Sequence, residues 1–393
     1  MTTLSNFILE KLDTLVIVIN QAGKIQYVNP SVKKMLGYEP QRLIGQTWLT
    51  TSSQSLNEIL EIKKNTIDLL KSRKIDAVTQ EYSFSVERKV FDSKGREKWI
   101  LWNLSLSPEN SIVGIGQDIS EIKEAEKKLI SGNNLLKEKN KEVIDSIRYS
   151  ERIQQAILPN VDLLKSKFSE AFVLYNPKDI VSGDFYWFAE RNNKLFLAAI
   201  DCTGHGVPGA LMTILANSLL KNIIRQDITN PGQILKKLDE YLFEELNLNT
   251  ENKTPDGMDI SLCVFDFEKN ILEFSGAFRP LVLVRDYEFI EFKGARYPIG
   301  FYNDIEKNFE TTQISLVEGD TFYLFSDGYI DQFGGDSTKE GGKKFNKKSF
   351  RNLLLDMQNL NLEEQEGYLD YAFNNWKQQF EQTDDVLVMG VKV

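Results

Sequence analysis

The chain has 393 residues, enough for two or three domains with sizeable cores. Its formal net charge of −10 argues against nucleic acid as the main partner, and the sequence has no basic stripe. Its two cysteines, Cys202 and Cys263, exclude a disulfide framework and a CxxC metal site, as expected in a reducing cytoplasm. The sequence shows no signal peptide and no apolar run near the ~20 residues of a membrane helix, so we expect a cytoplasmic protein with no membrane partner.

Residues 1–121 alternate short apolar runs with turns, which predicts a sheet with small helices. Runs at 15–19 and 25–28 predict a hairpin, and a helix capped at 29–31 is expected to end at Gly37. A helical stretch at 56–70 and strands at 80–91, 97–107 and 112–119 follow. The segments VNPSVKKMLGYEPQRLIGQ and GIGQDISEIKEAE resemble a PAS sensor domain over nearly its whole length.

The ligand of this PAS-like region is unknown. A photoactive flavin–cysteine adduct needs a Cys, but none precedes Cys202, and a histidine-ligated haem needs a His, but the chain's single one is His205. Three alternatives remain: a small apolar ligand, a non-covalent cofactor, or an empty domain that serves only for dimerisation.

A Lys- and Glu-rich linker at 122–159, without Pro until Pro159, predicts a long helix. Apolar residues recur at a spacing of seven, which is typical of a coiled coil, with Asn133 and Asn140 at core positions. We therefore expect a parallel homodimer through the PAS domain and the coiled coil; a single amphipathic helix on its own domain is the alternative. The two sets of seam positions are Ile122, Leu129, Leu136, Val143, Ser150 and Ile157, and Ile119, Glu126, Asn133, Asn140, Ile147 and Gln154.

Residues 160–393 carry four acidic motifs at the edges of apolar, strand-like runs. They are SGDFYWF at 182–188, IDCTGHGVPGALM at 200–212, FSDGYIDQFGG at 325–335 and TDDVLVM at 383–389. Carboxylates brought together without Arg or Lys beside each one would repel, and divalent cations would remove that penalty. Oxygen ligands without a Cys or His cluster indicate Mg²⁺ or Mn²⁺ rather than zinc.

In order and spacing these motifs resemble the SpoIIE/RsbU-type branch of the metal-dependent PPM (PP2C-like) serine phosphatases. The resemblance implies an α+β protein whose C-terminal domain is an α-β-β-α sandwich, preceded by the PAS sheet and the coiled-coil linker. It implies two bound Mn²⁺ or Mg²⁺ ions. Asp201 would bridge both ions, the Cys202 carbonyl would complete one site, and Asp384 is preferred to Asp385. The implied metal-site residues are Asp184, Asp201, Cys202, Asp327 and Asp384.

Other residues near these motifs have two interpretations each. His205 is either a general acid for the leaving serine oxygen or a loop histidine that orders the metal turn. Arg279 either orients phosphate or is an exposed loop arginine. Gly204 and Gly206 allow the backbone to approach a bound substrate closely. Asp259 is interpreted as a strand cap.

The resemblance therefore implies a bacterial signalling enzyme. It would be a PAS-regulated protein serine/threonine phosphatase in which a metal-bridging water attacks the phosphorus of a phosphoserine or phosphothreonine. The implied substrate is a phosphorylated anti-anti-sigma (STAS-type) protein. Two alternatives stay open: a catalytically silent dimeric scaffold whose phosphatase-like domain binds a partner, and an activity on other phosphoesters such as nucleotides.

Overall fold

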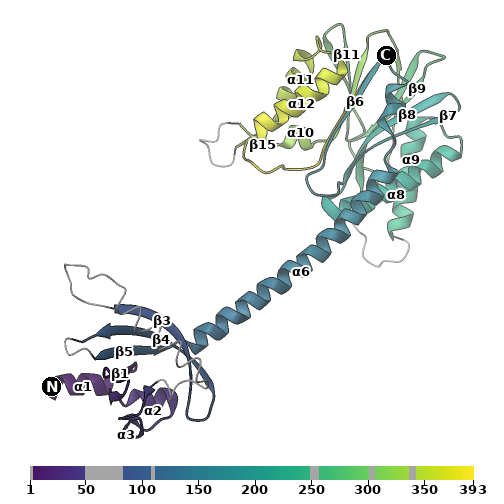
Figure 1. The fold of residues 1–393 in the computed structure, drawn as a ribbon. Helices are drawn as coiled ribbons and strands as arrows, with labels where there is room; N and C mark the ends of the chain where they lie inside the picture. The colour runs from purple at the N-terminus through teal and green to yellow at the C-terminus, as the bar shows by residue number, and fades with distance from the viewer. Residues whose placement is uncertain (1–2, 49–82, 108–110, 248–255, 301–305, 336–341) are drawn as a thin grey trace. The chain divides into compact units, whose positions relative to one another are not determined.

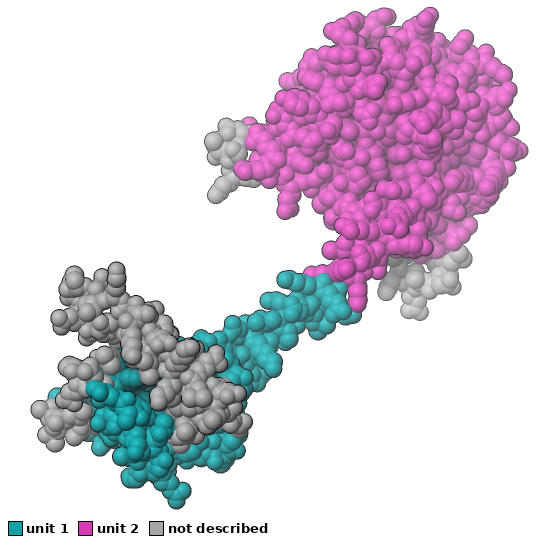
Figure 2. Space-filling view, viewed as in Figure 1, with its two compact units in different colours: residues 1–139 teal, residues 140–393 magenta. Residues whose placement is uncertain are grey.

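The computed structural model describes residues 3–48, 83–107, 111–247, 256–300, 306–335 and 342–393. They fall into two compact units, Met1–Lys139 and Asn140–Val393, which Figure 2 shows in two colours. The predicted helix at 56–70 lies outside the described residues.

The first unit is built on one antiparallel sheet of five strands in the order β2-β1-β5-β4-β3. Alternate residues of β1 and β4, such as Ile17 and Trp102, pack with Val32 and Leu36 of a short helix in the core. The elements are α1 (Thr3–Lys11), β1 (Leu15–Ile19), β2 (Ile25–Val28), α2 (Ser31–Leu36), α3 (Pro40–Leu43), β3 (Ser83–Phe91), β4 (Glu97–Leu106) and β5 (Ile112–Asp118). The predicted hairpin and the three later strands are present.

The start of α2 differs from the prediction. The residue before the helix is Pro30, and no side chain caps the first turn. Asn29 is instead buried and fixes the start of β1: its Oδ1 accepts from the Val16 amide at 2.9 Å, and its Nδ2 donates to the Thr14 carbonyl at 2.9 Å. The helix does end at Gly37, which has a left-handed conformation with φ +72°.

Helix α6 (Ser120–Ile157) is continuous over 38 residues. Ile122, Leu129, Leu136 and Val143, all on the predicted coiled-coil seam, are more than half exposed within the chain. The seam prediction is wrong at Gln154, which is buried within the second unit against Ser182 and Thr213 rather than offered to a partner helix.

The second unit is a sandwich of two five-stranded antiparallel sheets. One has the order β13-β10-β9-β8-β7 and the other β12-β11-β14-β17-β6. The strands are β6 (Glu170–Asn176), β7 (Asp184–Arg191), β8 (Lys194–Cys202), β9 (Met258–Asp266), β10 (Ile271–Ala277), β11 (Leu281–Arg285), β12 (Glu288–Phe292), β13 (Thr312–Ser315), β14 (Thr321–Phe325) and β17 (Val386–Lys392). A two-stranded ribbon pairs β15 (Phe333–Gly334) with β16 (Lys343–Lys344).

Helices cover both outer faces of the sandwich (Figure 1). The side chains of α8 and α9 pack on the first sheet, and those of α11 and α12 pack on the second. The helices of this unit are α7 (Val161–Lys165), α8 (Gly206–Arg225), α9 (Pro231–Asn247), α10 (Gly328–Asp331), α11 (Asn346–Asp356) and α12 (Leu362–Lys377). The predicted α-β-β-α architecture is confirmed; the sequence reading missed the short elements α7, α10 and β13.

Strand β8 shows how the sequence specifies these layers. Its side chains alternate between the two faces: Phe196, Ala198 and Ile200 pack toward the helices, whereas Leu195, Leu197 and Ala199 pack toward the second sheet. Asp201 continues the second series. Its side chain therefore belongs to the face between the sheets, at the position where the apolar core ends.

Helix α8 is long and apolar enough to cross a bilayer by length and composition, with a mean hydropathy of 1.3, contrary to the expectation from the sequence. Its apolar character has another cause. More than half of that window, 56%, is buried, and Ala216, Leu220 and Ile223 are part of the core beneath the first sheet.

Candidate active site

Three aspartates lie side by side across neighbouring strands at one end of the sandwich. The strand register pairs Asp184 of β7 with Asp201 of β8, and Asp201 with Asp259 of β9. Directly opposed residues of antiparallel strands point to the same face with Cβ atoms about 5 Å apart, and like charges in such positions destabilise the sheet. The row therefore needs cations to offset its charge.

The second sheet brings more acids to the same end. Asp327 follows β14, and Asp384 and Asp385 precede β17. Because β14 and β17 are antiparallel neighbours, the end of the first meets the beginning of the second. Asp201, Asp259, Asp327, Asp384 and Asp385 line one hollow of about 580 Å³.

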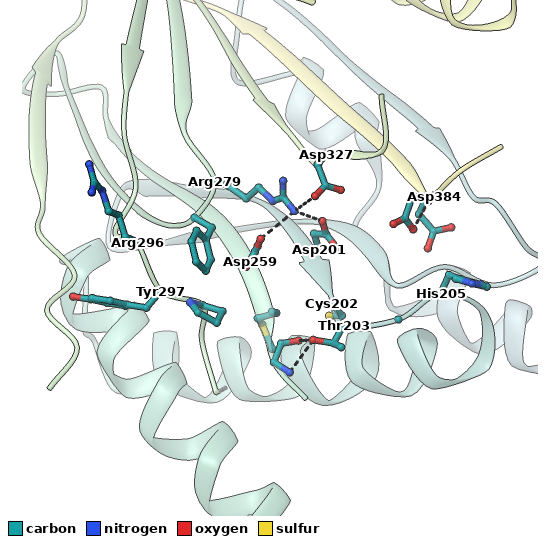
Figure 3. Close-up of a pocket in the computed structure, with 16 residues that line it drawn as sticks. Asp201, Cys202, Thr203, His205, Asp259, Arg279, Arg296, Tyr297, Asp327 and Asp384 are labelled. Atoms are coloured by element: carbon teal, nitrogen blue, oxygen red, sulfur yellow. Dashed lines mark hydrogen bonds and ion pairs between the residues drawn. The ribbon is translucent and has the colours of Figure 1, made fainter. Parts of the chain in front are cut away.

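Arg279 lies at the centre of this acidic group (Figure 3). Its Nη2 is 2.5 Å from Asp201 Oδ2, 2.8 Å from Asp327 Oδ2 and 3.0 Å from Asp259 Oδ2. The Arg279 side chain is 14% exposed, so the interpretation as an exposed loop arginine is wrong. One guanidinium thus contacts three carboxylates and offsets only part of their charge. Its Nε is buried without a hydrogen-bond partner.

Burial and mutual repulsion raise the pKa values of the acidic row. Burial, followed by the charge of Asp201, raises the pKa of Asp184 well above its usual range. Burial raises the pKa of Asp201 to about 7, although Arg279 lowers it, and raises that of Asp259 to about 6. A single arginine therefore leaves part of the negative charge uncompensated.

These residues fit divalent cations. Asp184 is 3% exposed, and its Oδ2 has no hydrogen-bond partner, so a buried carboxylate oxygen remains to be satisfied. The donors are oxygens, the type that Mg²⁺ and Mn²⁺ prefer. Within the described ranges no three acidic, His or Cys side chains already converge as ligands do; the carboxylates surround the guanidinium instead.

Asp384 and Asp385 are adjacent but differently placed. Asp385 is buried, and its two oxygens accept from the backbone amides of Lys178 and Gly183, both at 2.7 Å. Asp384 is exposed and accepts at Oδ1 from the amide of Asp385. Asp385 is thus occupied in holding the turn before β7, which leaves Asp384 as the better candidate ligand.

The turn after β8 packs tightly against the turn before β7. A Cβ atom on Gly183 would overlap the Gly204 carbonyl oxygen, so only glycine fits there. The Cys202 amide donates to the Gly183 carbonyl at 3.1 Å, and the Cys202 side chain points into the core beneath the first sheet. The Cys202 carbonyl therefore remains the group of this residue that a ligand could use.

His205 does not belong to the acidic group, as Figure 3 shows. Its Nδ1 is 2.6 Å from Asp179 Oδ2, and both side chains are about half exposed. Gly204 lines the hollow together with His205, whereas Gly206 lies under Asp179, whose Oδ2 is 3.1 Å from a Cβ placed on that glycine.

The structure brings Asp184, Asp201, Asp327 and Asp384 to one end of the sandwich, as the motifs predict. Asp179 was missed, Asp259 was interpreted only as a strand cap, and Asp385 was considered only as the less favoured neighbour of Asp384. Asp259 carried a signal, since the alternation of β9 places it on the inter-sheet face as Asp201 is placed on β8. Asp179 had none, because only the folded turn brings it to His205.

One solved structure defines the class of the second unit. This unit resembles the SiaA-PP2C domain of Pseudomonas aeruginosa, with 32% sequence identity and a TM-score of 0.58, over 65% of this chain and 98% of that one. A further likeness, at 16% identity and a TM-score of 0.46, covers 85% of this chain and 88% of a structure of the PP2C phosphatase domain with a regulatory fragment of SpoIIE from Bacillus subtilis. The C-terminal unit is a PP2C-type phosphatase domain.

The family follows from the sequence models. The model described as Stage II sporulation protein E (SpoIIE) matches residues 191–393, and the PAS fold matches residues 5–119. The chain belongs to the SpoIIE family and carries a PAS domain before its phosphatase domain. A curated relative, the phosphoserine phosphatase RsbP of Bacillus subtilis (strain 168), is 27% identical over 160 residues. That match covers 40% of this chain and 38% of RsbP.

Proposed function

We propose that this protein is a PAS-regulated, metal-dependent protein serine/threonine phosphatase with the boundaries 1–121, 122–159 and 160–393 for its sensor, linker and catalytic parts. The observation that carries the proposal is the acidic row of Asp184, Asp201 and Asp259, joined by Asp327, whose charge one arginine offsets only in part. A structural role for so many crowded carboxylates would lower stability without benefit.

Two Mn²⁺ or Mg²⁺ ions are the proposed cofactors. When bound, they would activate a water for attack on phosphorus and offset the charge that develops on the phosphoryl oxygens. Asp184, Asp201, Asp327 and Asp384 would hold them, together with the Cys202 carbonyl. Asp385 and Gly183 fix the spacing of the turns that carry these candidate ligands.

Substrate contacts are proposed for residues around the hollow. Arg279 has a buried guanidinium with an unused Nε, which can serve a phosphoryl oxygen when divalent cations have replaced it on the carboxylates. Gly204 exposes backbone without a side chain at the rim, and Gly206 supports the turn. His205 lines the hollow but is paired with Asp179, so it can donate a proton to the leaving serine oxygen only by turning toward the acidic row.

The proposed substrate is a phosphoserine- or phosphothreonine-bearing regulator of the STAS anti-anti-sigma type. The RsbP relative is named a phosphoserine phosphatase, which supports phosphoserine as the residue that is dephosphorylated. The resemblance of the four motifs to the SpoIIE/RsbU-type branch supports a STAS-type regulator as the protein that carries it. We propose a cytoplasmic location, where such a regulator would meet the protein.

Regulation is proposed to reach the site through α6. The exposed Ile122, Leu129, Leu136 and Val143 supply an apolar stripe for a parallel homodimer. At the other end of the helix, Gln154 donates to the Ser182 carbonyl at 2.7 Å and accepts from the Ser182 amide at 3.1 Å. Ser182 lies two residues before Asp184, so rotation of α6 would move the acidic row.

The test is release of phosphate from a phosphoserine STAS-type protein and from p-nitrophenyl phosphate, with Mn²⁺ against EDTA. We expect metal-dependent turnover in the wild type and none in Asp201→Ala. A second candidate, a silent scaffold, predicts phosphoprotein binding without turnover on either substrate, also when residues 160–393 are assayed alone.

A further inference from the structure

A second hollow continues from the acidic one. Its volume is about 650 Å³, and it shares Asp259, Phe278, Arg279 and Asp327 with the first. From there it runs to the start of α11, where Lys347, Lys348 and Arg351 line it. We call this second hollow the basic groove.

The three cations at the α11 end of the basic groove, Lys347, Lys348 and Arg351, are exposed and have no carboxylate partner among the described residues. Lys347 and Lys348 make no ion pair, and Arg351 stacks on the ring of Phe289 at 4.8 Å. By contrast, Lys344 nearby is paired with Asp331 at 2.7 Å. Asp259 and Asp327 belong to the part of the lining that is shared with the first hollow, around Arg279. At the α11 end, where Asp331 is paired with Lys344, the three cations face the single charge of Glu291.

Phe278 stands where the two hollows meet. Its backbone has φ +56°, a left-handed conformation that is unfavourable for a bulky aromatic residue. The strained conformation leaves the ring 51% exposed instead of packing it into the core. The Phe278 amide donates to the Ala295 carbonyl at 2.8 Å, which holds the turn in place. Strain of this kind persists where the exposed side chain has a task.

We propose that the basic groove selects the substrate segment that carries the phosphorylated residue. This inference rests on the proposed phosphatase function and specifies its substrate class. The substrate segment has an apolar residue beside the phosphoserine, on either side, and this residue packs on Phe278. It also has Asp or Glu nearby, whose carboxylates contact Lys347, Lys348 and Arg351. The acidic end of the sandwich repels carboxylates, so such residues bind only along the groove, away from the reacting phosphate.

The test compares two labelled phosphoserine peptides of equal length, one with flanking Asp and Glu and one with Asn and Gln in their places. We measure kcat/KM with Mn²⁺, and Kd by fluorescence anisotropy in EDTA. Wild type should prefer the acidic peptide by about tenfold at low salt, and salt should weaken the preference. The preference should fall to about twofold or less in Lys347→Gln/Lys348→Gln. It should persist in the charge-matched control Lys221→Gln/Lys236→Gln, which alters exposed lysines of α8 and α9.

The outcomes separate the two levels of the proposal. Turnover of both peptides at equal kcat/KM, or equal loss of preference in both double variants, overturns the groove while the phosphatase stands. Preferential binding without any turnover, even of p-nitrophenyl phosphate, supports the groove's specificity and contradicts the phosphatase.

Phe278→Gly provides a second test that does not depend on charge. Glycine adopts positive φ freely, so this variant should fold at least as stably as the wild type. It should raise KM about fivefold for a phosphopeptide with Leu beside the phosphoserine, and change it less for one with Gly there. Equal KM changes for the two peptides overturn the role of Phe278.

Discussion

Two arginines at the two ends of one strand show different uses of charge. Arg285, at the end of β11, meets one carboxylate with two bonds: Nε to Asp320 Oδ1 at 2.6 Å and Nη2 to Asp320 Oδ2 at 2.5 Å. Asp320 Oδ2 also accepts from the Val317 amide at 2.9 Å. Arg279, just before β11, offers one nitrogen to three carboxylates.

In the Arg285–Asp320 cluster the charges balance and the carboxylate oxygens have hydrogen-bond partners, so it needs no ligand from solution. The cluster around Arg279 is short of positive charge and leaves a carboxylate oxygen of Asp184 and the Nε of Arg279 without partners. A buried group that is not satisfied within the chain indicates a ligand, because its desolvation would otherwise cost stability for no return. A cluster whose charges are balanced within the chain has a structural role, whereas a cluster with uncompensated negative charge is a candidate metal site.

The largest effect should come from Asp201→Asn. Activity with Mn²⁺ should fall at least ~1000-fold, corresponding to about 4 kcal/mol of lost transition-state stabilisation. The melting temperature of the metal-free protein should stay equal or rise, because one of the crowded carboxylates is gone. A large loss of metal-free stability would show that Asp201 is structural, and the comparison would fail.

Asp320→Asn should have the opposite profile. It leaves Arg285 half-satisfied, and since that arginine is partly exposed we expect a loss of about 2 kcal/mol in the free energy of unfolding. Thermal and urea unfolding measure it. Asp286→Asn, an exposed neighbour with φ +51° that asparagine tolerates, is the control and should be neutral. A loss of Mn²⁺ affinity in folded Asp320→Asn would contradict a purely structural role for the Arg285–Asp320 pair.

Arg279→Gln tests whether the arginine and divalent cations compete for the same carboxylates. Removing the resident positive charge should raise Mn²⁺ affinity about tenfold or more, near 1.4 kcal/mol, while lowering the melting temperature of the metal-free protein. Calorimetric titration measures the affinity. Arg296→Gln, in the same hollow but without an ion pair to the acidic row, should leave affinity nearly unchanged. Weaker Mn²⁺ binding in Arg279→Gln would contradict a competitive role.

The smallest effect concerns the connection to α6. Gln154→Ala leaves the amide and carbonyl of Ser182 without their partner and should cost about 1 kcal/mol or more of stability. Activity should fall several-fold even where the protein is fully folded. Gln155→Ala is the matched control: it lies one position along, and among the described residues its side chain bonds to that of Glu151 alone. Equal activity in the two variants would remove Gln154 from the proposed route of regulation.

The sequence predicted the elements that are long and strongly patterned. The apolar runs ending at Asp201 and Asp327 gave the central strands and the ends at which the acids gather. It did not predict that Asp259 joins the row, because the pairing of β9 with β8 is a long-range contact. Gln154 was misassigned for a related reason: a spacing of seven does not tell a partner helix from the chain's own core. Arg279 was undecided because only the strained turn at Phe278 directs it inward.

The most direct test of the central claim is calorimetric titration of Mn²⁺ into the metal-free protein, run beside Asp201→Asn and Asp286→Asn. We expect saturable binding in the wild type and in Asp286→Asn, and its loss or severe weakening in Asp201→Asn while that variant stays folded. Equal binding in all three proteins, or none in the wild type, would contradict the assignment of the acidic row as the metal site.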